Sequence, residues 1–351
     1  MAWRPQNSPN EYDGPIRMRK ALWRSKNVVS IRLLRGVGLD QTVDYLTNFG
    51  FLRDEIPRDE TLSLGSGSHS PLEVVRAMSV IANGGFLINP YFISHIENEL
   101  GEELWKARPV EACSPCEQVE HIQDIESQLA AELEGISFDE NIEERISAPQ
   151  VISSQTAFLV ADMMRTAVRA NGNWNKKTYW LGTGWRARNI LGRTDIGGKT
   201  GTTNDAKDTW FSGFSHNLVA TSWVGFDDPS RQLGRATRNQ NIVNRNPEKF
   251  NWIGNGLIGS EDGAKAAQPA WIRFMQQVLA DKTSQPFVVP EDIVQVRIDR
   301  SSGLLTRRSD HTTLFEYFSR GTEPTQFVKE EDIIDPATLG DQKSEESGDI
   351  F

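Results

Sequence analysis

Residues 196–204 read Ile-Gly-Gly-Lys-Thr-Gly-Thr-Thr-Asn, and residues 208–214 read Asp-Thr-Trp-Phe-Ser-Gly-Phe. The two runs predict two strands joined by a polar turn. Gly198 and the lysine after it also occur at the end of phosphate-binding loops, which need a glycine five positions earlier and a helix after the lysine. Position 193 is Arg193 and a second strand is expected to follow, which excludes a nucleotide site of this kind.

Lys199 lies on the first of these strands, with hydroxyls close to it at Thr200 and Thr202. Gly201 lacks a Cβ, so an extended peptide can come close to the backbone there. The lysine and the two hydroxyls can hold a carboxylate through charge-assisted hydrogen bonds, and a free strand N–H can receive a carbonyl oxygen. These residues therefore predict half of an acyl-transfer site.

Charge is unevenly distributed along the 351 residues, which carry 38 basic and 48 acidic side chains and a net charge of −10. Residues 111–150 contribute −10 and residues 329–351 contribute −6, so the rest of the chain is about +6. The negative total argues against nucleic acid as a partner. The first acidic segment has few aromatic residues, so it is expected to be a mobile insertion that leaves the folded body. The end of the second acidic segment is expected to be disordered.

The sequence indicates neither a membrane segment nor a metal centre. It has no run of about eighteen apolar residues, and its first residues lack the apolar core of an export signal. Cys113 and Cys116 have only His121 near them, so a local disulfide or two free thiols is expected rather than zinc, which needs four ligands. His69 and His95 lack metal-ligand spacing, and no cofactor is expected.

The first part of the chain predicts helices over residues 16–22, 28–34 and 39–49. The triplet Ser-Lys-Asn at 25–27 separates the first two expected helices. It is expected at their junction, where polar side chains can point into a cleft. The alternative is that Ser25 is only the N-cap of the second helix. The acyl-transfer pattern around Lys199 favours the cleft.

Local signals predict the later elements. Ser70 caps a helix, with Pro71 at its first position and Glu73 completing a capping box. The other expected elements are a strand-like segment at 86–96, helices at 153–169 and 269–279, a strand at 218–225 that completes an antiparallel meander, and a strand at 294–298. The side chains expected to face inward are Phe158, Ala161, Met164 and Val168 in the first helix and Trp271, Phe274, Met275 and Val278 in the second.

Eight short motifs occur in an order that resembles one enzyme family. They are Trp3-x-Pro5-x-Asn7, Gly14-Pro15-Ile16, Ser25-Lys26-Asn27, Ser70-Pro71-Leu72-Glu73, Ala82-Asn83-Gly84-Gly85, Gly182-Thr183-Gly184, Lys199-Thr200-Gly201-Thr202-Thr203-Asn204 and Trp223-Val224-Gly225-Phe226-Asp227. The chain resembles the transpeptidase domain of class A penicillin-binding proteins, the bifunctional peptidoglycan synthases, and is most similar to the 1a kind. The resemblance runs from Trp3 to about Thr325 and is weakest in the acidic segment.

The resemblance implies an α+β fold of the penicillin-binding transpeptidase and serine β-lactamase kind. In this fold helices pack on an antiparallel sheet, and a cleft lies beside the Lys199 strand. The expected organisation is an incomplete transpeptidase domain at 1–100 and 151–285, an acidic insertion at 101–150, a C-terminal extension at 286–334 and a disordered acidic tail at 335–351.

The resemblance also implies roles for individual residues. In the family, a serine of a Ser-x-x-Lys motif attacks the D-Ala-D-Ala amide of a peptidoglycan stem peptide, and β-lactams inhibit covalently. Ser25 resembles the proton-relay hydroxyl, Asn27 the amide that holds substrate backbone, and Lys199 the cation that supports the relay. Thr200 and Thr202 resemble the carboxylate binders, and the Thr202 N–H resembles one of two oxyanion donors. Such enzymes work on the periplasmic side of the cytoplasmic membrane.

One departure from the family bears on activity, because none of the twelve lysines has a serine three residues before it. In the family that motif precedes the Trp-x-Pro-x-Asn loop, so a truncated frame or a C-terminal piece is expected, without the glycosyltransferase domain and the membrane segment. One hypothesis is a transpeptidase portion that is inactive alone. Another is a non-catalytic remnant that binds stem peptides or β-lactams, and a third is a β-lactamase, which needs the same missing serine. Covalent labelling by penicillin separates the first two.

Overall fold

The computed structural model describes residues 4–8, 10–112, 146–215, 217–234, 251–253, 256–258 and 261–337. Cys113, Cys116, most of the predicted acidic insertion and the end of the predicted tail lie outside these residues.

A three-stranded antiparallel sheet carries the predicted acyl-transfer stretch. It consists of β7 (Ile196–Thr202), β8 (Asp208–Ser215) and β9 (Leu218–Gly225), in the order β7-β8-β9. The register pairs Lys199 with Ser212 and Gly201 with Trp210. The predicted meander is therefore confirmed. Within the described residues β7 has a strand neighbour on one side only, so it is an edge of this sheet.

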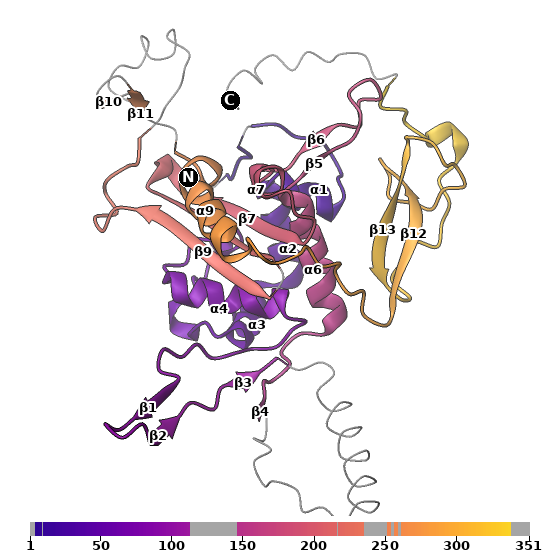
Figure 1. Ribbon diagram of the computed structural model, residues 1–351. Helices are drawn as coiled ribbons and strands as arrows, with labels where there is room; N and C mark the ends of the chain where they lie inside the picture. The colour runs from indigo at the N-terminus through magenta and orange to yellow at the C-terminus, as the bar shows by residue number, and fades with distance from the viewer. Residues whose placement is uncertain are drawn as a thin grey trace, which may run out of the picture.

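Helices cover both faces of the sheet (Figure 1). Phe211 and Phe214 of β8 point to opposite faces because side chains alternate along a strand. Phe211 packs with Trp271 of α9 (Gln268–Val278), next to the π-helical turn η6 (Gly263–Ala267) and α7 (Arg186–Leu191). Phe214 packs with Met164 of α6 (Ser154–Ala167), beside α4 (Pro71–Ala82). The sheet is the middle layer of three.

Helix ends and faces follow the sequence signals closely. Ser70 and Glu73 form the predicted capping box of α4, and Ser153 caps α6. The predicted inward residues of α6 are all buried. In α9 the prediction for Phe274 was wrong, because its side chain is 48% exposed while Ile272 is buried in the cluster with Trp271.

The N-terminal part consists of short helices that lead to one tight turn. They are α1 (Met18–Trp23), α2 (Asn27–Val37) and α3 (Leu39–Leu46), followed by the 3-10 turns η1 (Thr47–Phe49), η2 (Arg53–Glu55) and η3 (Glu60–Leu64). The turn between α1 and α2 holds Ser25 and Lys26, which confirms that the Ser-Lys-Asn triplet lies at a helix junction. Lys26, and not Ser25, occupies the N-cap position of α2.

Short strand pairs extend from this body. They are β1 (His95–Glu97) with β2 (Glu103–Lys106), β3 (Val110–Glu111) with β4 (Ile146–Ser147), β5 (Ala170–Asn171) with β6 (Trp180–Leu181), and β10 (Asn251–Ile253) with β11 (Gly256–Ile258). The strand predicted over 86–96 is therefore mostly wrong. Only its end forms β1, and Phe86 makes an isolated bridge to Gln150. The β1–β2 and β5–β6 hairpins lie at opposite ends of the molecule (Figure 1).

A C-terminal hairpin packs against α6. It consists of β12 (Ile293–Asp299) and β13 (Thr313–Ser319), and the 3-10 turn η7 (Glu330–Asp332) follows. Arg19 of α1 pairs with Asp162 of α6 at 2.6 Å and donates to Glu316 of β13 at 2.8 Å. Arg17 also pairs with Glu316, at 2.9 Å. This network joins the hairpin to the helix that ends just before Ser25.

Candidate active site

Ser25 and Lys199, which are 174 positions apart in the sequence, meet in the structure. The Lys199 Nζ donates a hydrogen bond to the Ser25 Oγ at 2.9 Å, and a second one to the Thr200 carbonyl at 2.8 Å. Ser25 has a φ of +52°, in the left-handed region that costs a non-glycine residue free energy. The α1–α2 turn therefore holds a strained backbone that directs this hydroxyl to the edge strand.

Lys199 lacks a carboxylate partner within the described residues. Burial lowers its pKa from 10.5 to about 8, because desolvation disfavours the charged amine. An anion that enters beside an amine with such a pKa stabilises its charged form. Near neutral pH this amine releases and takes up a proton at little cost in free energy. The pair can therefore attract a carboxylate and pass a proton through Ser25.

Lys26 anchors the turn from the other side, a role that the sequence did not reveal. Its side chain is 4% exposed, and its Nζ donates to the Glu11 carbonyl at 3.1 Å and pairs with Asp13 at 3.2 Å. The buried Asn7 donates to the same Glu11 carbonyl and accepts from the Val28 N–H at the start of α2. Residues 6–8 and 10–13 thus fix the position of Ser25.

Asn27 does not join the Ser25–Lys199 pair. It is the first residue of α2, and its Nδ2 donates to the Gln6 carbonyl at 2.9 Å. Its predicted role in holding substrate backbone remains a prediction, and the amide would have to exchange this contact for a substrate.

The two predicted carboxylate binders have different partners. Thr200 donates from its Oγ1 to the Thr183 Oγ1 at 3.0 Å, and the Thr183 N–H donates to the Trp23 carbonyl at 3.4 Å. Thr183 therefore links β7 to the end of α1. Its signal in the sequence is the Gly-Thr-Gly motif at residues 182–184, which by itself indicates no role for the threonine. Thr202 accepts from the Gly263 N–H at 3.0 Å, which leaves its own hydroxyl proton available for an anion.

Gly201 lies where two backbones approach closely. A Cβ on this residue would lie 3.1 Å from the Cβ of Trp210, its partner on β8. A Cβ on Gly263 would lie 2.7 Å from the Gly201 carbonyl oxygen, so glycine is required on that side. The absence of side chains lets η6 pack closely against this end of β7, and the approach of an extended peptide to Gly201 remains a prediction.

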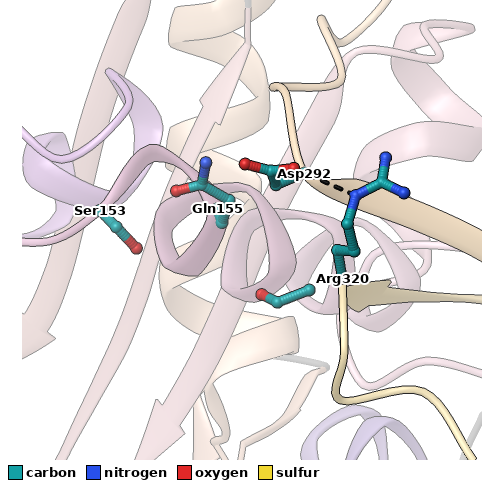
Figure 2. A pocket seen from close by; sticks show the side chains of 5 residues that line it. Ser153, Gln155, Asp292 and Arg320 are labelled. Carbon is teal, nitrogen blue, oxygen red and sulfur yellow. Dashed lines mark hydrogen bonds and ion pairs between the residues drawn. The ribbon is translucent and has the colours of Figure 1, made fainter.

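A cavity of about 500 Å³ lies elsewhere, between the start of α6 and the base of the C-terminal hairpin, and Figure 2 shows it. Arg320 pairs there with Asp292 at 3.1 Å, and Gln155 donates to the Glu291 carbonyl. None of the predicted site residues lines it, so it does not belong to the candidate site.

One group of side chains has a composition that suits a metal ion. Glu55, His69 and Glu73 bring possible ligand atoms within 4.8 Å of one another. Glu73 already accepts two hydrogen bonds from Ser70 in the capping box, and His69 packs on the Phe51 ring at 4.5 Å. These contacts give both residues structural roles.

Comparisons with known proteins identify the family of this chain. Residues 1–244 match the penicillin binding protein transpeptidase domain, and residues 289–331 match the penicillin-binding protein 1A C-terminal domain. Penicillin-binding protein 1A of Vibrio cholerae is 45% identical over 94% of this chain, and that of Escherichia coli is 40% identical over 92%. The chain spans 37% and 39% of the lengths of these two relatives.

Solved structures show the same fold. Penicillin-binding protein 1A from Haemophilus influenzae superposes with a TM-score of 0.74 at 38% identity, over 93% of this chain and 43% of that one. The PonA1 protein from Mycobacterium tuberculosis, also solved in complex with penicillin V, has a TM-score of 0.52 at 17% identity, over 81% of this chain and 62% of that one. Within its described part, this chain forms no helix with the length and apolar content that a membrane crossing requires. The chain therefore belongs to the transpeptidase family of penicillin-binding proteins, of the 1A kind, and has the α+β fold of that family.

Proposed function

We propose that this chain supplies the proton-relay and carboxylate-binding half of a D-Ala-D-Ala transpeptidase site. The observation that carries the proposal is the hydrogen bond between Lys199 and Ser25, formed at the edge of β7. A peptide that adds to this edge as a further strand puts its C-terminal carboxylate near Lys199, Thr200 and Thr202. Its reacting carbonyl oxygen can then accept a hydrogen bond from the backbone N–H of Thr202.

In the complete reaction a serine oxygen attacks the amide carbon of a stem peptide, and D-Ala leaves with a proton. The acyl group then passes to the amine of a neighbouring peptide. Ser25 carries the departing proton, and Lys199 stabilises the charge that develops on the relay. The attacking serine belongs to a Ser-x-x-Lys motif that this sequence lacks. We infer that the chain alone does not form an acyl-enzyme, because activation of a nucleophile requires an adjacent base and a hydroxyl in line with the amide.

We also propose the division into a transpeptidase part at 1–100 and 151–285, an insertion at 101–150, an extension at 286–334 and a tail at 335–351. The separate C-terminal match at 289–331 supports the extension. By the names of its relatives, we further propose a place in the cell envelope, with peptidoglycan stem peptides as substrates and β-lactams as covalent ligands.

Fluorescent penicillin tests the proposal. The purified chain should give no covalently labelled band, whereas a longer protein that also carries the Ser-x-x-Lys motif should be labelled. In that longer protein Lys199→Ala should abolish labelling and leave the circular dichroism spectrum unchanged. Normal labelling of Lys199→Ala would show that the site is misplaced.

A labelled band from the chain alone that disappears in Ser25→Ala would mean that Ser25 itself is the nucleophile. Reversible penicillin binding by the chain, with no labelling of the longer protein, would instead favour the second candidate function, a binding module.

A further inference from the structure

Glu55, His69 and Glu73 come together from separate segments of the N-terminal part. Glu55 is the last residue of η2, and Glu73 lies in the first turn of α4. His69 comes just before the N-cap of that helix. One possible ligand atom from each of the three residues lies within 4.8 Å of the other two. These three side chains, the η2–α4 cluster, combine an imidazole with two carboxylates, which are ligands that zinc takes in proteins.

The capping box of α4 uses only one oxygen of Glu73. The Ser70 N–H and the Ser70 hydroxyl both donate to the Glu73 Oε2, each at 2.7 Å. The other oxygen, Oε1, is not part of the capping box, and an ionised carboxylate accepts on both of its oxygens. The cap therefore holds this carboxylate in place and leaves it one oxygen with which to bind an ion.

The imidazole of His69 is packed on both sides but lacks a hydrogen-bond partner at one nitrogen. Its ring lies against Phe51, with centroids 4.5 Å apart and planes at 44°. A Cβ on Gly67 would overlap the imidazole, so the glycine makes room for it. Nδ1 is buried and has no hydrogen-bond partner in the part of the chain that the structure describes. A buried polar atom without a partner costs free energy, and coordination of a metal ion offsets that cost.

The two carboxylates of the cluster repel each other unless a cation lies between them. Glu55 and Glu73 offer oxygens within 4.8 Å of each other, and among the described residues neither forms an ion pair with a lysine or an arginine. A divalent cation between like charges turns their repulsion into attraction. The N-terminus of α4 opposes a cation with about half an elementary charge, which is less than the two negative charges of the glutamates.

The cluster needs a small movement to hold an ion. Tetrahedral zinc has bonds of about 2.0 to 2.1 Å to nitrogen and oxygen, so its ligand atoms lie about 3.4 Å apart. Glu55 is exposed, and its side chain can turn toward the other two ligands. Its backbone is held by the next residue, Ile56, whose side chain is 3% exposed. Three protein ligands leave the fourth position of the ion to water.

The imidazole decides which class of ion fits. Magnesium and calcium are hard ions that prefer oxygen ligands, whereas zinc binds imidazole and carboxylate together. We propose that the η2–α4 cluster binds one zinc ion through Glu55, His69 and Glu73. The ion joins η2 to α4, which packs against β9 of the central sheet. The inference does not rest on the proposed function, which uses other residues.

Isothermal titration calorimetry with zinc chloride tests the proposal on the intact 351-residue chain, after treatment with EDTA and removal of the chelator. Cys113 and Cys116 are replaced by serine in every sample, so that their thiols do not bind zinc. This cysteine-free chain should bind zinc. Glu55→Gln and His69→Ala should each weaken binding more than about ten-fold, because loss of even an outer partner of a ligand costs about ten- to a hundred-fold in affinity.

His95→Ala is the matched control. His95 also lies beside a glutamate, Glu97, at 3.4 Å, but among the described residues it belongs to no group of three ligands. Its replacement should leave the zinc affinity unchanged. Glu55→Gln keeps the size of the side chain at an exposed position, so its circular dichroism spectrum should match that of the cysteine-free chain.

Bound zinc should also stabilise the folded state. At about a hundred times its dissociation constant, zinc should raise the melting temperature of the cysteine-free chain by roughly 5 °C. The same concentration should raise that of Glu55→Gln by about half as much or less, because its affinity is more than ten-fold weaker. Magnesium chloride at this concentration should leave both melting temperatures unchanged.

Failure of the cysteine-free chain to bind zinc would overturn the inference. Equal zinc affinities of this chain, Glu55→Gln and His69→Ala would overturn it as well. Tighter binding of magnesium or calcium than of zinc would do the same, because it would indicate a site made of oxygens alone. These outcomes leave the proposed function untouched, since penicillin labelling tests it separately.

Discussion

The Ser25–Lys199 pair combines two energetically unfavourable features, and their combination supports the proposed binding site. Lys199 is half-buried and has no carboxylate partner among the residues that the structure describes, and Ser25 has a left-handed backbone conformation. Each costs folding free energy, and neither contributes to the core. A carboxylate beside Lys199 would recover part of that cost as binding free energy.

Burial of Lys199 should make the stability of the protein depend on pH in alkaline solution. Its pKa falls from 10.5 to about 8 on folding, so between these values the unfolded chain binds a proton that the folded chain does not. The free energy of unfolding should therefore gain a contribution that rises with pH from about 8 to 10.5 and is absent in Lys199→Met. Urea unfolding at several pH values measures it.

The exposed Lys282 gives the control for this experiment, because Lys282→Met should retain the full rise. The same rise in Lys199→Met would mean that another group causes it.

At the scale of elements, residues 6–8 and 10–13 and the α1–α2 turn act as one unit through Lys26. Lys26→Met should destabilise the protein by about 2 kcal/mol, because it removes the buried ammonium group that joins Asp13 to the Glu11 carbonyl, while Arg24 and Asn7 still contact these groups. Chemical denaturation measures the change. Lys20 also pairs with Asp13, at 3.6 Å, but is more exposed, so Lys20→Met should cost less than about 1 kcal/mol. Equal effects of the two variants would contradict the role given to Lys26.

Local signals explain which elements could be predicted. The capping box at Ser70 and the polar turn between β7 and β8 depend on neighbouring residues, and the structure has both where they were expected. The pairing of Ser25 with Lys199 came from the resemblance. Lys26 and Thr183 act through contacts with distant segments, which no local pattern encodes. The prediction that Phe274 faces inward was wrong because the helical spacing fits two adjoining faces of α9. Tertiary packing decides which of these faces is buried.

At the scale of the whole molecule, the C-terminal hairpin stabilises the helix that leads to Ser25. Glu316 is 12% exposed and contacts both Arg17 and Arg19. Glu316→Gln should lower the free energy of unfolding by about 2 kcal/mol, because two arginines lose their shared carboxylate. Thermal unfolding measures the loss. Glu331→Gln, at a surface ion pair with Lys329, is the control and should change stability little.

The insertion should be removable without harm to the rest of the protein. Val110 pairs with Ile146 and Glu111 with Ser147, so the two ends of the acidic segment lie side by side. Replacing residues 113–145 by a short Gly-Ser linker should shift the melting temperature by less than about 4 °C. In a longer protein that carries the nucleophile, the same deletion should leave penicillin labelling nearly unchanged. A loss of about ten-fold or more would show that the segment contributes to the site.

The open edge of β7 also affects how the protein behaves when concentrated. A strand edge that can accept a peptide can equally accept the edge of a neighbouring molecule, which is how sheets grow into aggregates. β7 is a poor template for strand pairing between molecules, because it contains Gly197, Gly198 and Gly201. The charge of Lys199 also repels the same edge of a second copy. Raising the pH above about 8 removes that charge, so light scattering from concentrated solutions should increase there. A carboxylate ligand at the edge should suppress it.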